Sequence, residues 1–111
     1  MSYKVLFICT YNQCRSPTAE HIFADWPGID ARSAGVGDEA KVPISRELID
    51  WSDLIVVMEE AHREALARKF RPHLRNKPVV CLDIPDEYQY MDPVLVQVLR
   101  QRVAGILPTA T

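Results

Sequence analysis

A buried strand that runs into a cysteine-containing loop and then a helix start constrains this chain more than any other feature. The four apolar residues from Val5 to Ile8 predict a strand that is covered on both faces. Ser16 followed by Pro17 is typical of a helix start, with a hydroxyl at the N-cap and a proline where no N–H is needed. The connecting Cys9–Arg15 loop is therefore short, and it lies directly before a helix N-terminus.

This arrangement favours anion binding by a reactive thiol. A loop wrapped ahead of a helix N-terminus points its backbone N–H groups inward, and these groups stabilise negative charge. Cys9 begins the loop, so we expect its thiolate to be stabilised there, with the Ser16 hydroxyl donating to the sulfur. Arg15 can donate two parallel hydrogen bonds to phosphate oxygens. The alternative is a buried structural cysteine beside a surface arginine; the strand and the helix start favour a phosphate-handling thiolate.

The Cys9–Arg15 loop resembles the signature of the low-molecular-weight protein tyrosine phosphatases. That signature has a Cys, five residues and Arg-Ser, with Asn at the fourth position and Ser-Pro-x-Ala-Glu at its end. The matching residues are Asn12, Arg15, Ser16, Pro17, Ala19 and Glu20. Two further blocks, 33–35 and 53–58, are also similar to the family. The resemblance implies a nucleophilic Cys9, with Arg15 as the catalytic phosphate ligand. It implies that substrate is bound by Thr10, Tyr11, Asn12, Gln13, Cys14 and Ser16.

Two departures from the family pattern concern the shape of the pocket. The family usually has Gly where this chain has Tyr11. Gly adopts positive φ freely, whereas a Tyr in the left-handed region would cost about 1–2 kcal/mol. Either the loop has a different shape here or Tyr11 is a wall of the pocket. The second departure is the short 36–52 segment, because the family has a further helix there that supplies part of the pocket wall.

The general acid is expected in the loop after the last strand. This loop contains Asp83 and then Asp86-Glu87-Tyr88, where the resembled family has Asp-Pro-Tyr. We predict that Asp86 is the acid, with Asp83 as the alternative, because Asp92 precedes Pro93 as a helix cap. Tyr88 is predicted to bind an aromatic substrate together with Tyr90, the alternative being packing within the loop.

The predicted reaction is hydrolysis of a phosphomonoester, with protein phosphotyrosine as the expected substrate, through a cysteinyl-phosphate intermediate. No metal or other cofactor is expected, because the loop N–H groups and Arg15 supply the positive field; His62 and His73 have no partner at metal-ligand spacing. A catalytically silent phosphate- or phosphoprotein-binding module is one alternative. A thiol-dependent arsenate reductase is another, but it needs a further redox cysteine pair and only Cys81 remains. Cys14 is either a disulfide partner of Cys9, as the resemblance implies, or a small buried residue.

The remaining pattern predicts four repeats of strand and helix. Strands are expected at 3–8, 29–33, 54–58 and 78–82, and helices at 17–26, 46–50, 59–70 and from Pro93. The first and third strands are unbroken apolar runs and so are central, which gives a doubly wound parallel sheet of order 2-1-3-4 in a three-layer α/β fold. The resemblance implies the flavodoxin-like phosphotyrosine phosphatase I type. The last residues, 107–111, are expected to fray.

Composition limits the other possibilities. We interpret residues 1–111 as a single domain with an apolar fraction of 48%. The net charge of −2 does not favour nucleic acid as a partner, and no apolar run reaches the roughly 20 residues of a membrane span. Three cysteines are an odd count that suits a reducing cytoplasm. We therefore expect a cytoplasmic monomer or weak dimer whose partner is a phosphorylated protein or a small phosphomonoester.

Overall fold

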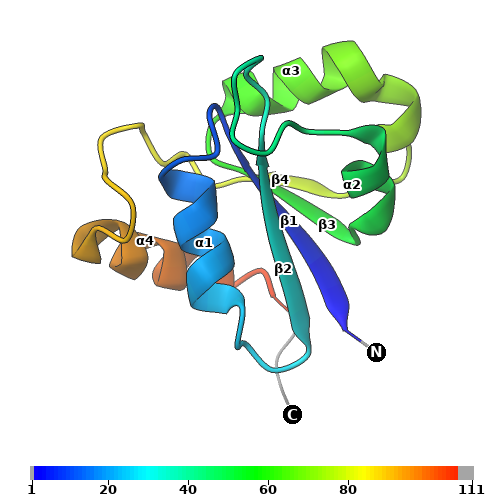
Figure 1. Ribbon diagram of the computed structural model, residues 1–111. Helices are drawn as coiled ribbons and strands as arrows, with labels where there is room; N and C mark the ends of the chain where they lie inside the picture. The colour runs from blue at the N-terminus through cyan, green and yellow to red at the C-terminus, as the bar shows by residue number, and fades with distance from the viewer. Residues whose placement is uncertain (1, 108–111) are drawn as a thin grey trace.

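A parallel four-stranded sheet forms the centre of the computed structural model, which describes residues 2–107 (Figure 1). The strand order is β2-β1-β3-β4, which confirms the predicted order. The strands are β1 (Tyr3–Cys9), β2 (Ile29–Gly35), β3 (Leu54–Val57) and β4 (Val79–Cys81). The helices are α1 (Arg15–Phe23), α2 (Arg46–Trp51), α3 (Glu60–Phe70), the 3₁₀ helix η1 (Arg71–Leu74) and α4 (Pro93–Ala104). The predicted fraying concerns 107–111, of which 108–111 lie outside the described residues.

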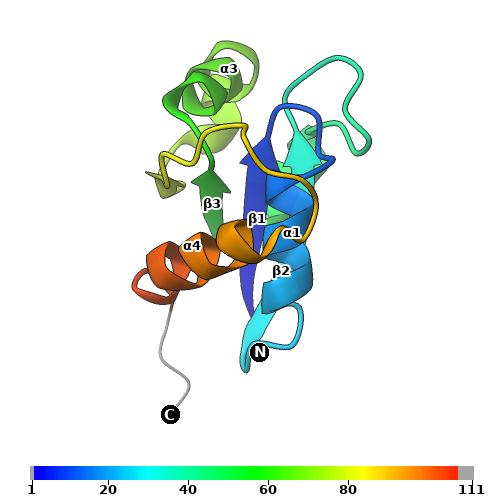
Figure 2. The same cartoon turned by 90° about the vertical axis from the view of Figure 1, so that its left-hand side faces the viewer.

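Two hydrophobic layers sandwich the sheet. β1 is paired on both sides, with Val5 opposite both Ala31 and Leu54, so both of its faces are covered and its sequence does not alternate. Its odd-numbered residues pack with Phe23 of α1 and Leu99 of α4. The even-numbered residues face α2 and α3. Figure 1 shows α1 and α4 on one face of the sheet and α2 and α3 on the other, and Figure 2 shows α1 and α4 in front of the sheet.

Helix α1 begins earlier than the sequence predicts. It starts at Arg15 with Cys14 at the N-cap position, and no side chain caps it. The prediction that Ser16 is the N-cap was wrong, because its hydroxyl is engaged with the Cys9 sulfur instead. Pro17 is still tolerated, since the first N–H groups of a helix have no intrahelical partner. The expected cap of α4 is confirmed: the Asp92 carboxylate accepts a hydrogen bond from the Val94 N–H at 2.8 Å.

The segment after β2 lies directly on the Cys9–Arg15 loop. A Cβ on Gly35 would lie 2.5 Å from the Thr10 carbonyl oxygen and 3.0 Å from the Asn12 nitrogen, so only glycine fits. The N–H of Gly37 donates to the Thr10 carbonyl at 2.8 Å, and the N–H of Lys41 donates to the Tyr11 carbonyl at 2.9 Å. The small residues at the end of β2 therefore permit close approach to this loop. Within residues 2–107, no helix is long and apolar enough to cross a membrane.

Candidate active site

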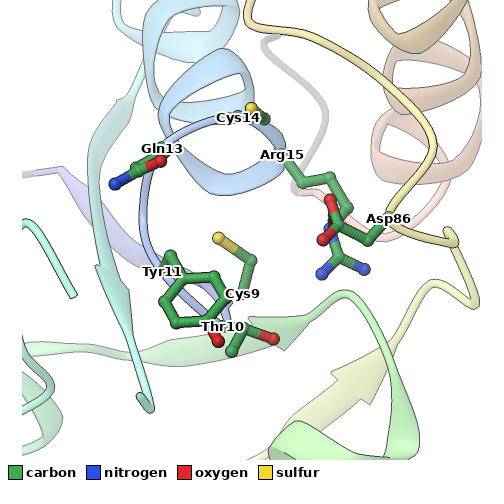
Figure 3. A pocket seen from close by; sticks show the side chains of 7 residues that line it. All are labelled: Cys9, Thr10, Tyr11, Gln13, Cys14, Arg15 and Asp86. Atoms are coloured by element: carbon green, nitrogen blue, oxygen red, sulfur yellow. Dashed lines mark ion pairs between the residues drawn. The ribbon is translucent and has the colours of Figure 1, made fainter. Parts of the chain in front are cut away.

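A small cavity opens above the Cys9–Arg15 loop, at the carboxyl ends of the strands where the sheet order reverses. Its volume is about 70 Å³. The residues that line it are Cys9, Thr10, Tyr11, Gln13, Cys14, Arg15 and Asp86. Figure 3 shows Tyr11 on one side of Cys9, and Arg15 with Asp86 on the other. The fold thus brings together six predicted loop residues and one acidic residue that lies 71 positions after Arg15.

The Cys9 sulfur lies at the base of this cavity and contacts two hydrogen-bonding groups. Cys9 is buried, with 3% of its surface exposed. The Asn12 N–H donates to its sulfur at 3.2 Å, and the Ser16 hydroxyl lies 2.9 Å from it, close enough for the predicted hydrogen bond. The sulfur therefore lies within hydrogen-bond distance of a backbone N–H and a hydroxyl.

Asn12 shapes the loop rather than lining the cavity. Its φ of 57° turns its N–H toward the sulfur, and Asn tolerates this left-handed conformation better than most residues. Its side-chain amide donates to the hydroxyls of Ser16 and Ser33, both at 2.9 Å, and Ser33 donates in turn to Glu20. Tyr11 does not have positive φ, so the strain considered for a tyrosine at this position is absent. Asn12 and Ser16, predicted to bind substrate, therefore act on the sulfur.

The Arg15 side chain is held from two directions. Only 2% of it is exposed, and its Nη1 pairs with the Glu59 carboxylate at 2.5 Å and donates to the Ile84 carbonyl at 2.7 Å. Its Nε lies 3.8 Å from the Asp86 carboxylate. Glu59 was missed by the sequence reasoning. The available signal was its position directly after a buried parallel strand, at the edge where ligand sites form.

His62 is a second residue that the sequence reasoning missed. Only 2% of its surface is exposed. Its Nδ1 accepts from the Glu59 N–H at 3.0 Å, and its Nε2 lies 2.9 Å from the Thr10 hydroxyl. Burial lowers the pKa of His62 to about 4, and the charge of Arg15 contributes to this lowering. The ring is therefore neutral near pH 7, and it connects the start of α3 to the Cys9–Arg15 loop.

The two candidate acids lie in different surroundings. Asp86 lines the cavity beside Arg15, and 59% of its side chain is exposed. Asp83 has a φ of 55° and accepts from the Cys81 thiol at 3.4 Å, away from the cavity lining. The geometry therefore places Asp86, the first choice from the sequence, at the same cavity as Cys9.

The predicted role of the loop tyrosines in the pocket does not agree with the structure. Tyr88 packs against the hydrophobic core on the α1 and α4 side of the sheet and does not line the cavity. Tyr90 contacts His21 edge to face, with ring centroids 6.4 Å apart. The alternative, packing within the loop, does not describe them either, because Tyr88 contacts the core and Tyr90 contacts His21 of α1.

Comparison with known proteins identifies the family. The model of the family described as "Low molecular weight phosphotyrosine protein phosphatase" matches residues 4–51. A protein-arginine-phosphatase of Geobacillus stearothermophilus is 31% identical, over 69% of this chain and 68% of the relative. The low-molecular-weight protein-tyrosine-phosphatase Wzb of Escherichia coli K12 is 30% identical, over 80% of each chain. The chain belongs to the low-molecular-weight protein tyrosine phosphatase family.

Solved structures of this family have the same fold. The tyrosine phosphatase Wzb from Escherichia coli K30, in complex with phosphate, superimposes with a TM-score of 0.77 at 28% identity, covering 97% of this chain and 100% of that chain. The family membership and this likeness support a phosphatase enzyme. The predicted recognition and fold class are thereby confirmed.

The remaining cysteines of this family member occupy different positions. Cys14 lines the same cavity as Cys9, and both are free thiols (Figure 3). Cys81 lies on β4, is only partly buried, and burial raises the pKa of its thiol to about 11. It lies in an exposed group with Glu60 and Asp83, whose side-chain ligand atoms are within 4.8 Å of one another. Cys81 is therefore a poor nucleophile outside the cavity.

Proposed function

We propose that this protein removes phosphoryl groups from protein phosphotyrosine through a cysteinyl-phosphate intermediate on Cys9. The observation that carries the proposal is that the Cys9 sulfur, the Arg15 guanidinium and the Asp86 carboxylate border one small cavity. These three groups are what a two-step displacement at phosphorus requires: a nucleophile, a cationic ligand for the phosphoryl oxygens and a proton donor.

In the first step, the Cys9 thiolate attacks phosphorus in line with the leaving oxygen. The backbone N–H groups of the Cys9–Arg15 loop and the Arg15 guanidinium bind the phosphoryl oxygens. Glu59 and the Ile84 carbonyl engage Nη1 of Arg15, and the Asp86 carboxylate lies 3.8 Å from Nε, so Nη2 is the nitrogen without a partner among the described residues. The S–P bond forms as the P–O bond breaks, and a protonated Asp86 donates its proton to the leaving oxygen.

In the second step, water hydrolyses the cysteinyl phosphate. Asp86, now a carboxylate, accepts a proton from the attacking water. The P–S bond breaks, inorganic phosphate leaves, and the thiolate is restored, with the Asn12 N–H again donating to the sulfur and the Ser16 hydroxyl 2.9 Å from it. The exposure of Asp86 suits this second role because water reaches it directly.

Tyr11 supports an aromatic phosphoester as substrate. The cavity has room for a phosphoryl group, so the rest of the substrate would extend past its mouth. Tyr11 is the aromatic residue among those that line the cavity, and 51% of it is exposed. Its ring can stack on the ring of a phosphotyrosine. It would then replace the wall that the shortened 36–52 segment does not supply.

Phosphoarginine is the second candidate substrate. Relatives named protein-arginine-phosphatase, from Geobacillus stearothermophilus and Bacillus subtilis, are 31% and 29% identical to this chain. The Asp86 carboxylate at the mouth of the cavity is an acceptor that a guanidinium can contact, and the exposed Gln13 amide is a second. The catalytic steps would be the same, with a P–N bond broken in place of the P–O bond.

The first experiment compares hydrolysis of p-nitrophenyl phosphate near pH 6 without added metal by the wild-type protein, Cys9→Ser and Cys81→Ser. We expect turnover by the wild type and by Cys81→Ser, the matched control outside the cavity, and none by Cys9→Ser. A folded wild-type protein that binds vanadate without turnover would instead indicate a phosphate-binding module. Competition between a phosphotyrosine peptide and a phosphoarginine peptide then identifies the substrate, because the preferred one has the higher kcat/KM.

A further inference from the structure

The start of α3 contacts both ends of the Cys9–Arg15 loop. His62 lies 2.9 Å from the hydroxyl of Thr10, the residue that follows the nucleophile. Glu59 pairs with Arg15 at the other end of the loop. These two residues also form the capping box of α3, in which each side chain receives the other's backbone N–H. The start of α3 therefore caps its own helix and also contacts the Cys9–Arg15 loop. The contact between His62 and Thr10 is not needed for the capping.

The hydrogen bonds determine which nitrogen of His62 carries the proton. Nδ1 accepts from the Glu59 N–H at 3.0 Å, so it has a free lone pair. In a neutral ring the hydrogen is then on Nε2. Nε2 therefore donates to the Thr10 hydroxyl oxygen. Because Arg15 is also close enough to disfavour a second positive charge, the neutral ring is the form that functions near pH 7.

The direction of this hydrogen bond leaves the Thr10 hydroxyl hydrogen free. Among residues 2–107, the Thr10 hydroxyl has no hydrogen-bond partner other than His62. Thr10 lines the cavity, and its carbonyl oxygen accepts from the Gly37 N–H, which fixes its backbone. A hydroxyl whose oxygen already accepts one hydrogen bond and whose backbone is held has few directions left for its own hydrogen.

We propose that His62 is a positioning residue of this phosphatase site: it orients the Thr10 hydroxyl so that Thr10 donates to an oxygen of the bound phosphoester. The inference rests on the proposed function. It assigns the Thr10 hydroxyl to substrate binding and gives His62 a role through Thr10, beyond the capping of α3.

A double-mutant cycle separates this role from helix capping. His62→Asn places an amide oxygen near the position of Nδ1, so it retains an acceptor for the Glu59 N–H, but it is too short to reach Thr10. Thr10→Val removes the hydroxyl with little change in shape. We expect each variant to lower kcat/KM for p-nitrophenyl phosphate about three- to tenfold, and the double variant to lower it no further. Thr10→Ser keeps the hydroxyl and should recover most of the kcat/KM that Thr10→Val loses.

Three additional measurements complete the test. His73→Asn, on η1, is the matched histidine control, and its kcat/KM should not change. Vanadate affinity is measured for the wild type, the two single variants and the double variant. This measurement tests the inference even if the wild type proves to be a binding module without turnover. ¹⁵N NMR of the histidine ring should show hydrogen on Nε2 at neutral pH.

Hydrogen on Nδ1 would overturn the inference, as would losses that multiply in the double variant. If His62→Asn has lower stability but unchanged kcat/KM and vanadate affinity, His62 acts only as a helix cap and the inference is wrong. A wild-type protein that neither hydrolyses the ester nor binds vanadate would refute the proposed function and this inference together.

Discussion

Arg15 and Glu59 form an ion pair of 2.5 Å between a fully buried guanidinium and a half-exposed carboxylate. The pair joins the first residue of α1 to the residue that precedes α3. It therefore connects the segments that follow the neighbouring strands β1 and β3. With Asp86 near Nε, this pair leaves Nη2 without a partner among the described residues. The geometry of Arg15 thus depends on a residue 44 positions away.

Replacing Glu59 should reduce activity without removing it. In Glu59→Gln the charge of Arg15 loses its partner, while a weaker hydrogen bond remains, so we expect kcat/KM to fall about tenfold. Some loss of Tm accompanies this change, because Glu59 also caps α3. Glu60→Gln is the control, because Glu60 forms an exposed ion pair with Arg63, three residues along the same helix. Equal effects of the two substitutions would contradict the assigned role. The kcat/KM of both variants is measured by steady-state kinetics at a temperature well below their Tm.

Replacing Asp86 should slow the chemical step. Asp86→Asn cannot donate the proton, so we expect kcat to fall by roughly 10²–10⁴-fold with little change in KM. The loss should be larger for alkyl phosphates than for p-nitrophenyl phosphate, whose leaving group needs less protonation. Asp83→Asn should leave kcat within about twofold, because Asp83 lies outside the cavity lining. The reverse pattern would move the role of acid to Asp83.

Burial of His62 predicts a pH dependence of stability. Its pKa is about 4 in the folded protein and 6.5 when unfolded, so the unfolded state binds the additional proton between these values. Stability should therefore fall as the pH is lowered from about 6.5 to about 4, by about 2–3 kcal/mol in total from this group. The unfolding free energy, measured with urea at several pH values in this range, should depend less steeply on pH in His62→Asn than in the wild type. The same pH dependence in both proteins would show that the ring is protonated in the native state. His73→Asn should keep the pH dependence of the wild type.

The close approach of Gly35 to the Cys9–Arg15 loop predicts sensitivity to a single methyl group. In Gly35→Ala the new Cβ would lie 2.5 Å from a backbone carbonyl oxygen that cannot move away without displacing the loop. We expect a loss of about 1–3 kcal/mol in stability together with reduced activity. Gly105→Ala, where the new Cβ meets nothing within 4 Å, should be neutral or slightly stabilising. Chemical unfolding of both variants measures the change in unfolding free energy. A fully active, stable Gly35→Ala would contradict the close packing of β2 against the loop.

Tyr11 should influence the binding of aromatic substrates more than catalysis. We expect Tyr11→Ala to raise KM for p-nitrophenyl phosphate about three- to tenfold while kcat changes little, because the ring contact is lost. Tyr90→Ala is the matched control, since Tyr90 is equally exposed but contacts His21. A phosphoester without a ring should not discriminate between wild type and Tyr11→Ala. An unchanged KM for the aromatic ester would remove Tyr11 from the substrate pocket.

Local patterns predicted the fold and the position of the site, whereas long-range contacts determined the details. The apolar runs at Val5–Ile8 and Leu54–Met58 specify central strands because parallel strands are covered on both faces. The Asp92 cap was predictable because it needs only its own helix. Glu59 and His62 were not, since their partners lie 44 and 52 residues away. Ser16 looked like a helix cap because the sequence does not show that its hydroxyl contacts the sulfur.

The exposure of Asp86 has a consequence for how such a chain diverges. The proposed nucleophile, Cys9, is the last residue of β1 and lies next to Asn12 and Ser16 of the following loop and α1. The proposed proton donor, Asp86, is an exposed residue of the loop after β4, which contacts Arg15. In the proposed mechanism, phosphate binding and turnover thus depend on separate segments. Substitutions in the loop after β4 can change or abolish turnover while the chain keeps its capacity to capture phosphate, so a family member can become a phosphate sensor without refolding its centre.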